Sequence, residues 1–551
     1  MNNLFSIIVI LLASGWVSEV RGDQRTVAGF ERYDVLHYDL SIDFNLPQKT
    51  FFGSVGMSVR VLDSMSVFDF HASPMTLTID SVIYRDARMT FRAMSDTVRA
   101  QLPQDIVPGS TLVLKIFYHG RAVFKGNYDD GGVYIPDTAN FTRVFTISEP
   151  RFARRWWPCK DMPSDKATLD IAITVPEGLT AVSNGVLKSV AGTGSVKTFT
   201  WETQYPIATY LVSVAAAPYA EFDNVYTGLR GDTMSVHYYV FPIDSAKIRQ
   251  DFKNVLAMLH FCALRFCEYP FIRDKFAMTE VNGELTMENQ TACSISSSII
   301  TGTRENEFTY FHELSHQWWG DFITPKTWHD SWLNEGFATY SEALYLEATK
   351  GYGAYRDYLD RLMSGPLGTL RGGVLARSDT SFWDEFGSAV YYKGAIVLHM
   401  LRGILGDSTF FIVLKNYVND PALQYGNATT ADFISVCEKG AGKNLSWFFD
   451  EWLVDHNDTT DRPMYEYAWK QQAVGGGYNL TLNIDQVTKN FVYTMPMTVE
   501  IRTTRAVEDI QIIDSLQSQT FPLDVTDQPV SVDIDPRHWI YKIMTLRKAP
   551  E

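Results

Sequence analysis

The spacing of hydrophobic and polar residues changes twice along the chain. From about Tyr33 to Tyr219, hydrophobic and polar residues alternate in short runs such as His37–Phe44 and Leu169–Val175, separated by glycine, proline and asparagine. Alternation bounded by turn residues predicts β-strands with one buried face. We therefore expect the N-terminal part to be built of strands.

The middle of the chain, from about Ile243 to His456, has hydrophobic residues at helical spacing instead. The amphipathic segments cover residues 244–267, 305–319, 330–350 and 390–404. Each of them is predicted to be helical. After Asp461-Arg-Pro463 short alternating runs return, and they indicate a small β-sandwich.

These three regimes predict a multidomain α+β fold. A chain of 551 residues is too long for one hydrophobic core. We expect an N-terminal β domain over residues 23–221, a mainly helical domain over 222–460 and a β-sandwich domain over 461–551.

Composition adds that the protein is globular and acidic. Hydrophobic residues make up 46% of the chain, and the net charge is −16. Nucleic-acid binding depends on Lys and Arg that neutralise phosphates, so no nucleic-acid partner is expected. The acidity serves solubility, and a negative field also attracts free α-amino groups. The five cysteines show no metal-binding spacing and are expected to be buried thiols.

The N-terminus carries an apolar run from Leu4 to Val17. It is shorter than the roughly 20 residues that span a bilayer, and it has the length of a signal-peptide core. We predict a signal peptide over residues 1–22 and export to the periplasm or the cell exterior, without stable membrane insertion after cleavage. No Lys or Arg precedes the run, so a retained N-terminal anchor is the alternative.

The helical region contains the candidate chemistry, an HExxH motif from His312 to His316. Residues four apart lie on the same face of a helix, so both imidazoles can bind one metal ion, and Glu313 can reach a water on that ion. The motif is short and also occurs by chance; the alternative is a helix with two partly exposed histidines.

A second predicted helix supplies a third ligand. Eighteen residues separate His316 from Glu335, which lies near the start of that helix. Two histidines and one glutamate leave a fourth position to water, as in catalytic zinc sites. We therefore predict one Zn²⁺ per chain, with Glu313 as the general base that activates the zinc-bound water. Gly336 costs about 1 kcal/mol within a helix, which points to close packing beside Glu335.

Several motifs together resemble the aminopeptidase N family of gluzincin zinc metallopeptidases, over nearly the whole chain after residue 22. The matching stretches are His312-Glu-Leu-Ser-His-Gln-Trp-Trp-Gly320 with Asn334-Glu335-Gly336, Thr286-Met287-Glu288-Asn289, Tyr391-Tyr392-Lys393-Gly394 and Ser148-Glu149-Pro150. The resemblance implies a saddle-like β domain, a thermolysin-like catalytic domain and a β-sandwich.

The resemblance also implies roles for individual residues. Tyr391 would stabilise the oxyanion, and Glu149 and Glu288 would bind the substrate α-amine. Met287 and Asn289 would contribute to substrate binding. The expected function is therefore a zinc aminopeptidase that acts on peptides with a free N-terminus. Glu342, seven residues after Glu335, is a further candidate that would orient a ligand histidine.

The chain departs from the family pattern at two points. Leu285 replaces the first glycine of the Gly-x-Met-Glu-Asn motif, which affects how closely substrate approaches that strand. The chain ends after the predicted sandwich, so no helical fourth domain is expected, and longer peptides would be accepted.

Two other classes of function remain open. One is a related zinc hydrolase, such as an endopeptidase or an epoxide hydrolase. The other is a non-catalytic peptide-binding scaffold on the same fold.

Overall fold

The chain forms two compact units in the computed structural model, which describes residues 27–123, 130–136, 144–283, 286–365, 370, 372–376, 385–455, 462–488 and 491–547. The first unit comprises Met1–Trp328 and Val418–Ala428, and the second comprises His329–Tyr417 and Thr429–Glu551. The predicted signal peptide and Leu285 lie outside the described residues.

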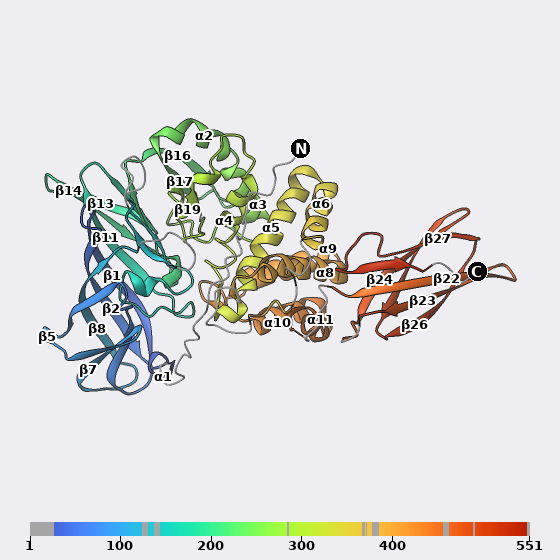
Figure 1. The fold of residues 1–551 in the computed structure, drawn as a ribbon, viewed down its shortest axis with the longest axis horizontal. Coiled ribbons are helices and arrows are strands. Elements are labelled where there is room, and N and C mark those ends of the chain that lie inside the picture. Colours follow the sequence, from blue (N-terminus) through green and yellow to red (C-terminus); the bar gives the residue numbers. More distant parts are fainter. Residues whose placement is uncertain are drawn as a thin grey trace. The chain divides into compact units, whose positions relative to one another are not determined.

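An eight-stranded sheet forms most of the N-terminal region (Figure 1). In spatial order its strands are β13 (Val186–Gly192), β14 (Val196–Glu202), β11 (Thr168–Pro176), β1 (Tyr33–Asn45), β2 (Thr50–Val61), β8 (Thr111–Arg121), β4 (Leu77–Tyr84) and β5 (Ala87–Arg88). Leu40 of β1 lies opposite Val55 of β2, and both are fully buried. Buried and more accessible positions alternate along β1 and β11, as the alternating pattern predicted.

Two smaller sheets complete this region. One has the order β3 (Met65–His71), β7 (Thr97–Ile106), β6 (Phe91–Met94), and the other β12 (Thr180–Ser183), β15 (Val214–Ala217), β10 (Val144–Ile147), β9 (Gly132–Tyr134). A short helix, α1 (Val27–Phe30), precedes β1. The N-terminal part of the protein is thus β-rich, as expected.

The rest of the first unit combines a sheet with helices. The sheet has the order β16 (Ala220–Thr227), β17 (Thr233–Val240), β18 (Phe276–Val281), β19 (Cys293–Ser296), and the helices are α2 (Ser245–Asp251), α3 (Val255–Arg265) and α4 (Glu307–Ser315). The amphipathic segment 244–267 is two helices rather than one.

Strands β18 and β19 lie in a region where the sequence pattern predicted helices. Every residue of both strands is buried, and β18 pairs in parallel with β17 on one side and β19 on the other. A strand covered on both faces has no hydrophobic alternation, so its sequence shows no period of two.

A two-stranded ladder attaches a later segment to the first unit. Strand β20 (Thr324–Pro325) pairs in parallel with β21 (Asn427–Ala428). This pairing explains why Val418–Ala428 belongs with the N-terminal part of the chain.

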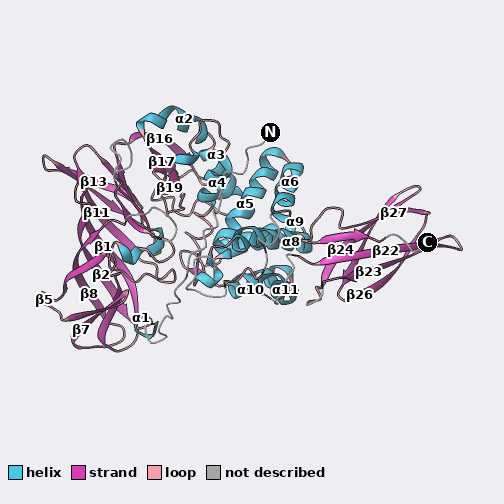
Figure 2. Cartoon of the chain, in the orientation of Figure 1, coloured by secondary structure: helices cyan, strands magenta, loops and turns pink. Residues whose placement is uncertain are grey.

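The second unit begins with helices (Figure 2). They are α5 (Trp332–Lys350), α6 (Tyr352–Met363), a π-helical turn (Ala389–Lys393), α8 (Gly394–Leu405), α9 (Asp407–Val418), α10 (Thr430–Ala441) and α11 (Ser446–Leu453). A capping box between Thr429 and Asp432 starts α10, and Gly442 ends it in the left-handed conformation.

Two sheets follow the helices in the second unit. One has the order β26 (Ser518–Val525), β23 (Gly477–Gln486), β22 (Met464–Val474), β28 (Ile543–Leu546), and the other β25 (Val507–Asp514), β24 (Met495–Thr503), β27 (Pro529–Ile534). The C-terminal region is therefore β-structured, as the returning alternation predicted.

All five cysteines are free thiols; Cys267 is partly buried, and the other four are buried. Among the described helices, none has the length and apolar character needed to cross a bilayer. The boundaries after residues 221 and 460 remain predictions.

Candidate metal and peptide-binding site

Helix α4 carries the HExxH motif and is held by its buried face. Tyr310, Phe311 and Leu314 are fully buried. The Phe311 ring contacts Phe261 edge-on, with ring centroids 5.8 Å apart. With this face packed inside the unit, the orientation of the two motif histidines is fixed by the helix itself.

The two motif histidines lie side by side, His312 in α4 and His316 at its C-cap. The ring centroids of His312 and His316 are 4.6 Å apart, with the rings 78° from coplanar. The His316 Nδ1 lies 2.9 Å from the Trp319 carbonyl oxygen. A carbonyl oxygen only accepts, so Nδ1 carries the hydrogen and the lone pair is on Nε2. The Trp319 carbonyl thus prepares His316 as a metal ligand through Nε2.

Glu313, between the two histidines, is buried with 6% of its surface exposed. Burial raises the pKa of Glu313 to about 7, while the two neighbouring histidines oppose that rise. The Thr286 hydroxyl donates a hydrogen bond of 2.7 Å to its Oε1. A carboxylate in this setting is suited to accept a proton near neutral pH.

The Thr286–Asn289 segment is fastened to α4 and to β19. Met287 and Ser294 exchange two backbone hydrogen bonds of 2.9 and 2.8 Å. The Gln317 side chain, directly after the HExxH motif, donates to the Glu288 carbonyl at 3.1 Å and accepts from the Thr291 backbone N–H at 2.9 Å. Asn289 accepts a 2.9 Å hydrogen bond from the Ser294 hydroxyl, so it braces the segment.

Glu149 and Glu288 bring two carboxylates together from distant parts of the sequence. Both are buried, and each offers a carboxylate oxygen within 4.8 Å of the other. Two buried carboxylates this close favour a cation between them. A substrate ammonium group has the required charge.

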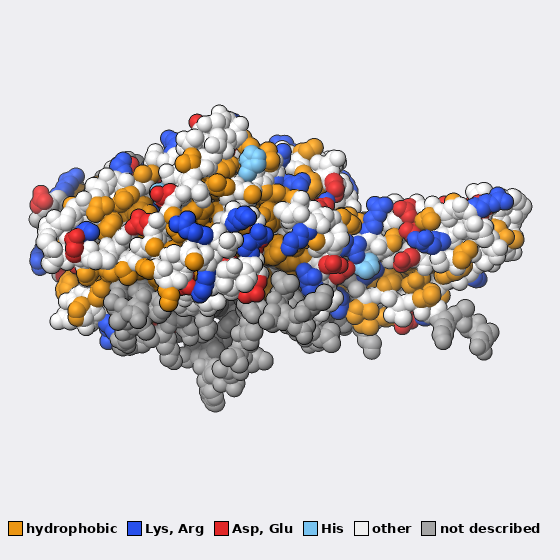
Figure 3. Space-filling model, turned by 90° about the horizontal axis from the view of Figure 1, so that it is seen from above, with side chains coloured by type: hydrophobic (Ala, Val, Ile, Leu, Met, Phe, Trp, Pro, Cys, Tyr) orange, Lys and Arg blue, Asp and Glu red, His pale blue; other side chains and the backbone are white. Residues whose placement is uncertain are grey.

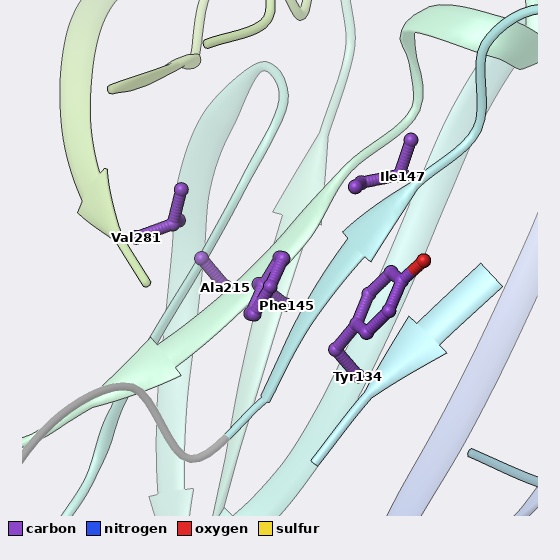
Figure 4. Packing of buried hydrophobic residues seen from close by; sticks show 5 residues of the cluster. All are labelled: Tyr134, Phe145, Ile147, Ala215 and Val281. Carbon is purple, nitrogen blue, oxygen red and sulfur yellow. The ribbon is translucent and has the colours of Figure 1, made fainter. Parts of the chain in front are cut away.

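A hydrophobic cluster positions the two strands that lead to these glutamates (Figure 4). It contains Tyr134, Phe145, Ile147, Ala215 and Val281. Phe145 and Ile147 belong to β10, which runs into Glu149, and Val281 ends β18, which runs towards Glu288. The Tyr134 and Phe145 rings stack with centroids 4.8 Å apart. The cluster therefore packs the strand that leads to Glu149 against the end of β18, seven residues before Glu288.

Two buried carboxylates lie beside the second motif histidine. Glu288, Glu313 and His316 offer ligand atoms that all lie within 4.8 Å of one another, and all three side chains are buried. Imidazole nitrogen and carboxylate oxygen are both ligands that zinc accepts. The first unit thus contributes the imidazoles of His312 and His316 to a candidate metal centre, and the carboxylates of Glu288 and Glu313 lie next to His316.

The second unit holds Glu335 and Tyr391 close in the fold. Glu335 lies in the first turn of α5, with 3% of its surface exposed, and Tyr391 lies in the π-helical turn before α8. A Cβ on Gly336 would come within 3.0 Å of the Gly394 Cα and 3.2 Å of the Val390 carbonyl. The close packing predicted for Gly336 is therefore present.

Glu342 has a contact that the sequence did not indicate. The Tyr358 hydroxyl donates a 3.1 Å hydrogen bond to its carboxylate. The His316 Nδ1 is held by a backbone carbonyl instead. A role for Glu342 in orienting a ligand histidine stays a prediction.

Two residues of this site were not assigned a role from the sequence. Thr286 occupies the variable position of the Gly-x-Met-Glu-Asn motif, and Gln317 follows the second histidine. Both are inside quoted motifs, but their partners are 27 and 29 residues away along the chain. In the sequence, only their position within these motifs indicates that Thr286 and Gln317 belong to the site.

One face of the protein carries side chains of several kinds. On the face drawn in Figure 3, basic side chains are interspersed with acidic and hydrophobic ones.

Two protein-family models match parts of the chain. Residues 35–211 match the Peptidase M1 N-terminal domain, and residues 258–452 match the Peptidase family M1 domain. These ranges together take up more than half of the chain, and they include every candidate site residue named above.

Curated relatives include plant and bacterial aminopeptidases. Aminopeptidase M1-B of Oryza sativa subsp. japonica is 28% identical over 446 residues, which are 76% of this chain and 49% of the relative. Aminopeptidase N of Lactococcus lactis subsp. lactis is 28% identical over 459 residues, 76% of this chain and 50% of the relative. The chain spans about half the length of these relatives.

Solved structures share the fold. Legionella pneumophila aminopeptidase A, in complex with aspartic acid, has a TM-score of 0.79 at 18% identity, covering 94% of this chain and 60% of that one. A mutant of the Deinococcus radiodurans M1 zinc metallopeptidase bound to a Tyr-Ser-Ala substrate has a TM-score of 0.66 at 24% identity, covering 77% and 94%.

Proposed function

Since the chain belongs to peptidase family M1, the family of aminopeptidase N, we propose that it is a zinc-dependent aminopeptidase that releases the N-terminal residue of peptides. The observation that carries this proposal is the arrangement around α4. A general-base carboxylate between two metal-binding histidines lies beside Glu288, which is paired with Glu149. Glu313 and the two histidines would carry out hydrolysis. The Glu149–Glu288 pair would recognise a free amine.

His312, His316 and Glu335 would hold the zinc ion. The HExxH spacing on α4, the buried place of Glu335 in the first turn of α5 and the M1 family match support this assignment. Zinc, when bound, acidifies a coordinated water and polarises the scissile carbonyl.

Glu313 would move the proton in this reaction. Its carboxylate takes a proton from the attacking water and delivers it to the leaving amine nitrogen, so the peptide bond breaks without a free hydroxide or amide anion. The Tyr391 hydroxyl would donate a hydrogen bond to the oxyanion that forms at the carbonyl oxygen.

Glu149 and Glu288 would measure one residue from the amine to the scissile bond. Two carboxylates bind an ammonium strongly when all three groups are buried. Met287 and Asn289, on either side of Glu288, would line the path of the substrate backbone. The Tyr-Ser-Ala substrate held by the Deinococcus neighbour supports peptides as the substrate class for this chain as well.

The proposal also covers the type of each domain. The N-terminal sheets would form a saddle-like domain, the central region a thermolysin-like catalytic domain, and the C-terminal sheets a sandwich. Export of the protein, with residues 1–22 as a signal peptide, also belongs to it.

The test uses a mixed peptide set, each peptide prepared free and N-acetylated. We expect stepwise release of amino acids from the free peptides, loss of release on zinc chelation, and recovery on adding Zn²⁺. Glu313→Gln should bind zinc with the wild-type stoichiometry and release nothing measurable, because the proton acceptor is gone.

Each alternative gives a different result. Cleavage of acetylated peptides at internal bonds would identify an endopeptidase. Zinc binding without turnover of any peptide would identify a scaffold or a hydrolase of another substrate class, and either result would contradict the proposal.

A further inference from the structure

The general base of this site has a dedicated hydrogen-bond donor. Thr286 Oγ1 donates to Glu313 Oε1 at 2.7 Å. Among the described residues, no hydrogen bond reaches Glu313 Oε2. The two oxygens of one carboxylate are therefore in different environments.

We propose that Thr286 is a positioning residue for catalysis, which holds the Glu313 carboxylate so that Oε1 remains an acceptor and Oε2 carries the proton. The inference rests on the proposed function. The donor bond persists through the cycle, because Oε1 accepts as a carboxylate oxygen and also as the carbonyl oxygen of the protonated acid.

Both partners of the Thr286–Glu313 hydrogen bond are held in place by neighbouring contacts. Met287, the next residue, exchanges two backbone hydrogen bonds with Ser294. The Cys293 thiol donates to the Glu313 carbonyl at 3.6 Å. The segment and the helix are thus both fastened to β19, at residues adjacent to the contact.

The nearby Glu288 carboxylate gives the Thr286–Glu313 hydrogen bond a function. Glu288 and Glu313 offer carboxylate oxygens within 4.8 Å of each other, and both are buried. Like charges at this separation repel, and rotation of the Glu313 carboxylate would relieve that repulsion. A donor on Oε1 opposes the rotation and keeps Oε2 in one orientation.

Threonine suits this role because its side chain is stiff. The branched Cβ restricts χ1, so the hydroxyl loses little rotational freedom when it binds Oε1. Valine has the same shape without the donor, and serine has the donor without the second methyl group. The two replacements separate the hydrogen bond from the packing.

The experiment compares Thr286→Val and Thr286→Ser with the wild type, on a free peptide under saturating zinc. We expect Thr286→Val to lower kcat about tenfold with KM within about twofold, and Thr286→Ser to keep kcat within about threefold. Zinc content and melting temperature should match the wild type in both variants, since neither change removes a ligand.

Two results would overturn the inference. Equal kcat in Thr286→Val and wild type would show that the donor is idle, and equal losses in both variants would show a packing effect. If the wild type itself releases no N-terminal residue while Glu313→Gln behaves identically, the proposed function fails instead. The two failures are therefore distinguishable.

Discussion

At the residue scale, Gln317 connects the metal-binding helix to the amine-binding segment. Its side chain is fully buried and bonds the Glu288 carbonyl, the Thr291 N–H and the Tyr269 hydroxyl. Thr291 has φ of +63°, which is unusual for a β-branched residue. The hydrogen bond that the Thr291 N–H donates to Gln317 helps to maintain this strained backbone after the substrate-binding motif.

Replacing Gln317 should loosen the amine site. Gln317→Met keeps the volume but leaves buried backbone groups without partners, at a cost of about 1–3 kcal/mol each. We expect a lower melting temperature and a KM for free peptides raised about tenfold or more, with a smaller change in kcat. Steady-state kinetics and thermal unfolding measure both effects; an unchanged KM in a folded variant would contradict this role.

A second prediction at this scale concerns pH. Burial raises the pKa of Glu280 from its ordinary 4.5 to about 8, and the Asp244 carboxylate contributes to the rise. The folded state therefore binds more protons than the unfolded state between these values, so stability falls as pH rises from 4.5 to 8.

Glu280→Gln removes this charge and keeps an acceptor for the Phe241 N–H, which now donates to Glu280 at 2.7 Å. We expect the variant to be more stable than the wild type at pH 8.5, on the order of 1–3 kcal/mol, and closer to it at pH 5. Denaturant unfolding at both values measures this, with the exposed Glu221→Gln as control. A stability difference that does not change with pH would refute the assignment.

At the element scale, α5 and α8 approach closely through two glycines. Gly336 follows Glu335 on α5, and Gly394 begins α8 directly after the Tyr391 turn. The atoms nearest to a Cβ on Gly336 are backbone atoms, at 3.0–3.2 Å, which cannot move aside as a side chain can. The contact therefore fixes the spacing of the two helices.

Gly336→Ala should separate α5 from α8 despite the better helix propensity of alanine. We expect a loss of about 1–3 kcal/mol in unfolding free energy and a drop in kcat, because Tyr391 moves with its turn. Gly353→Ala is the matched control, since nothing lies within 4 Å of its added Cβ, and it should gain about 0.5–1 kcal/mol. Stabilisation by both changes would contradict the packing argument.

At the scale of the whole molecule, the net charge of −16 shapes encounters with substrate. A negative field raises the local concentration of cationic peptides and is screened over about 10 Å at 0.1 M salt. Charge acts here on the rate of association, whereas the carboxylate pair acts on the bound amine.

Salt should therefore affect charged peptides unequally. Between 20 and 300 mM NaCl we expect kcat/KM to fall about threefold for a peptide with several lysines beyond its second residue, and to hold or rise for an aspartate-rich counterpart. The value of kcat should stay constant for both, because bound substrate no longer depends on the long-range field. An identical salt response of the two peptides would count against steering.

The sequence by itself determined the order of β-rich, helical and β-rich regions, because hydrophobic spacing reflects local backbone geometry. It also determined that His312 and His316 share a helix face, since four residues make about one turn. Tertiary structure alone decided that Gly336 packs on Gly394, that β18 is a buried strand, and that Thr286 and Gln317 bond partners 27 and 29 residues away. These contacts depend on how distant segments pack, and no local pattern encodes that packing.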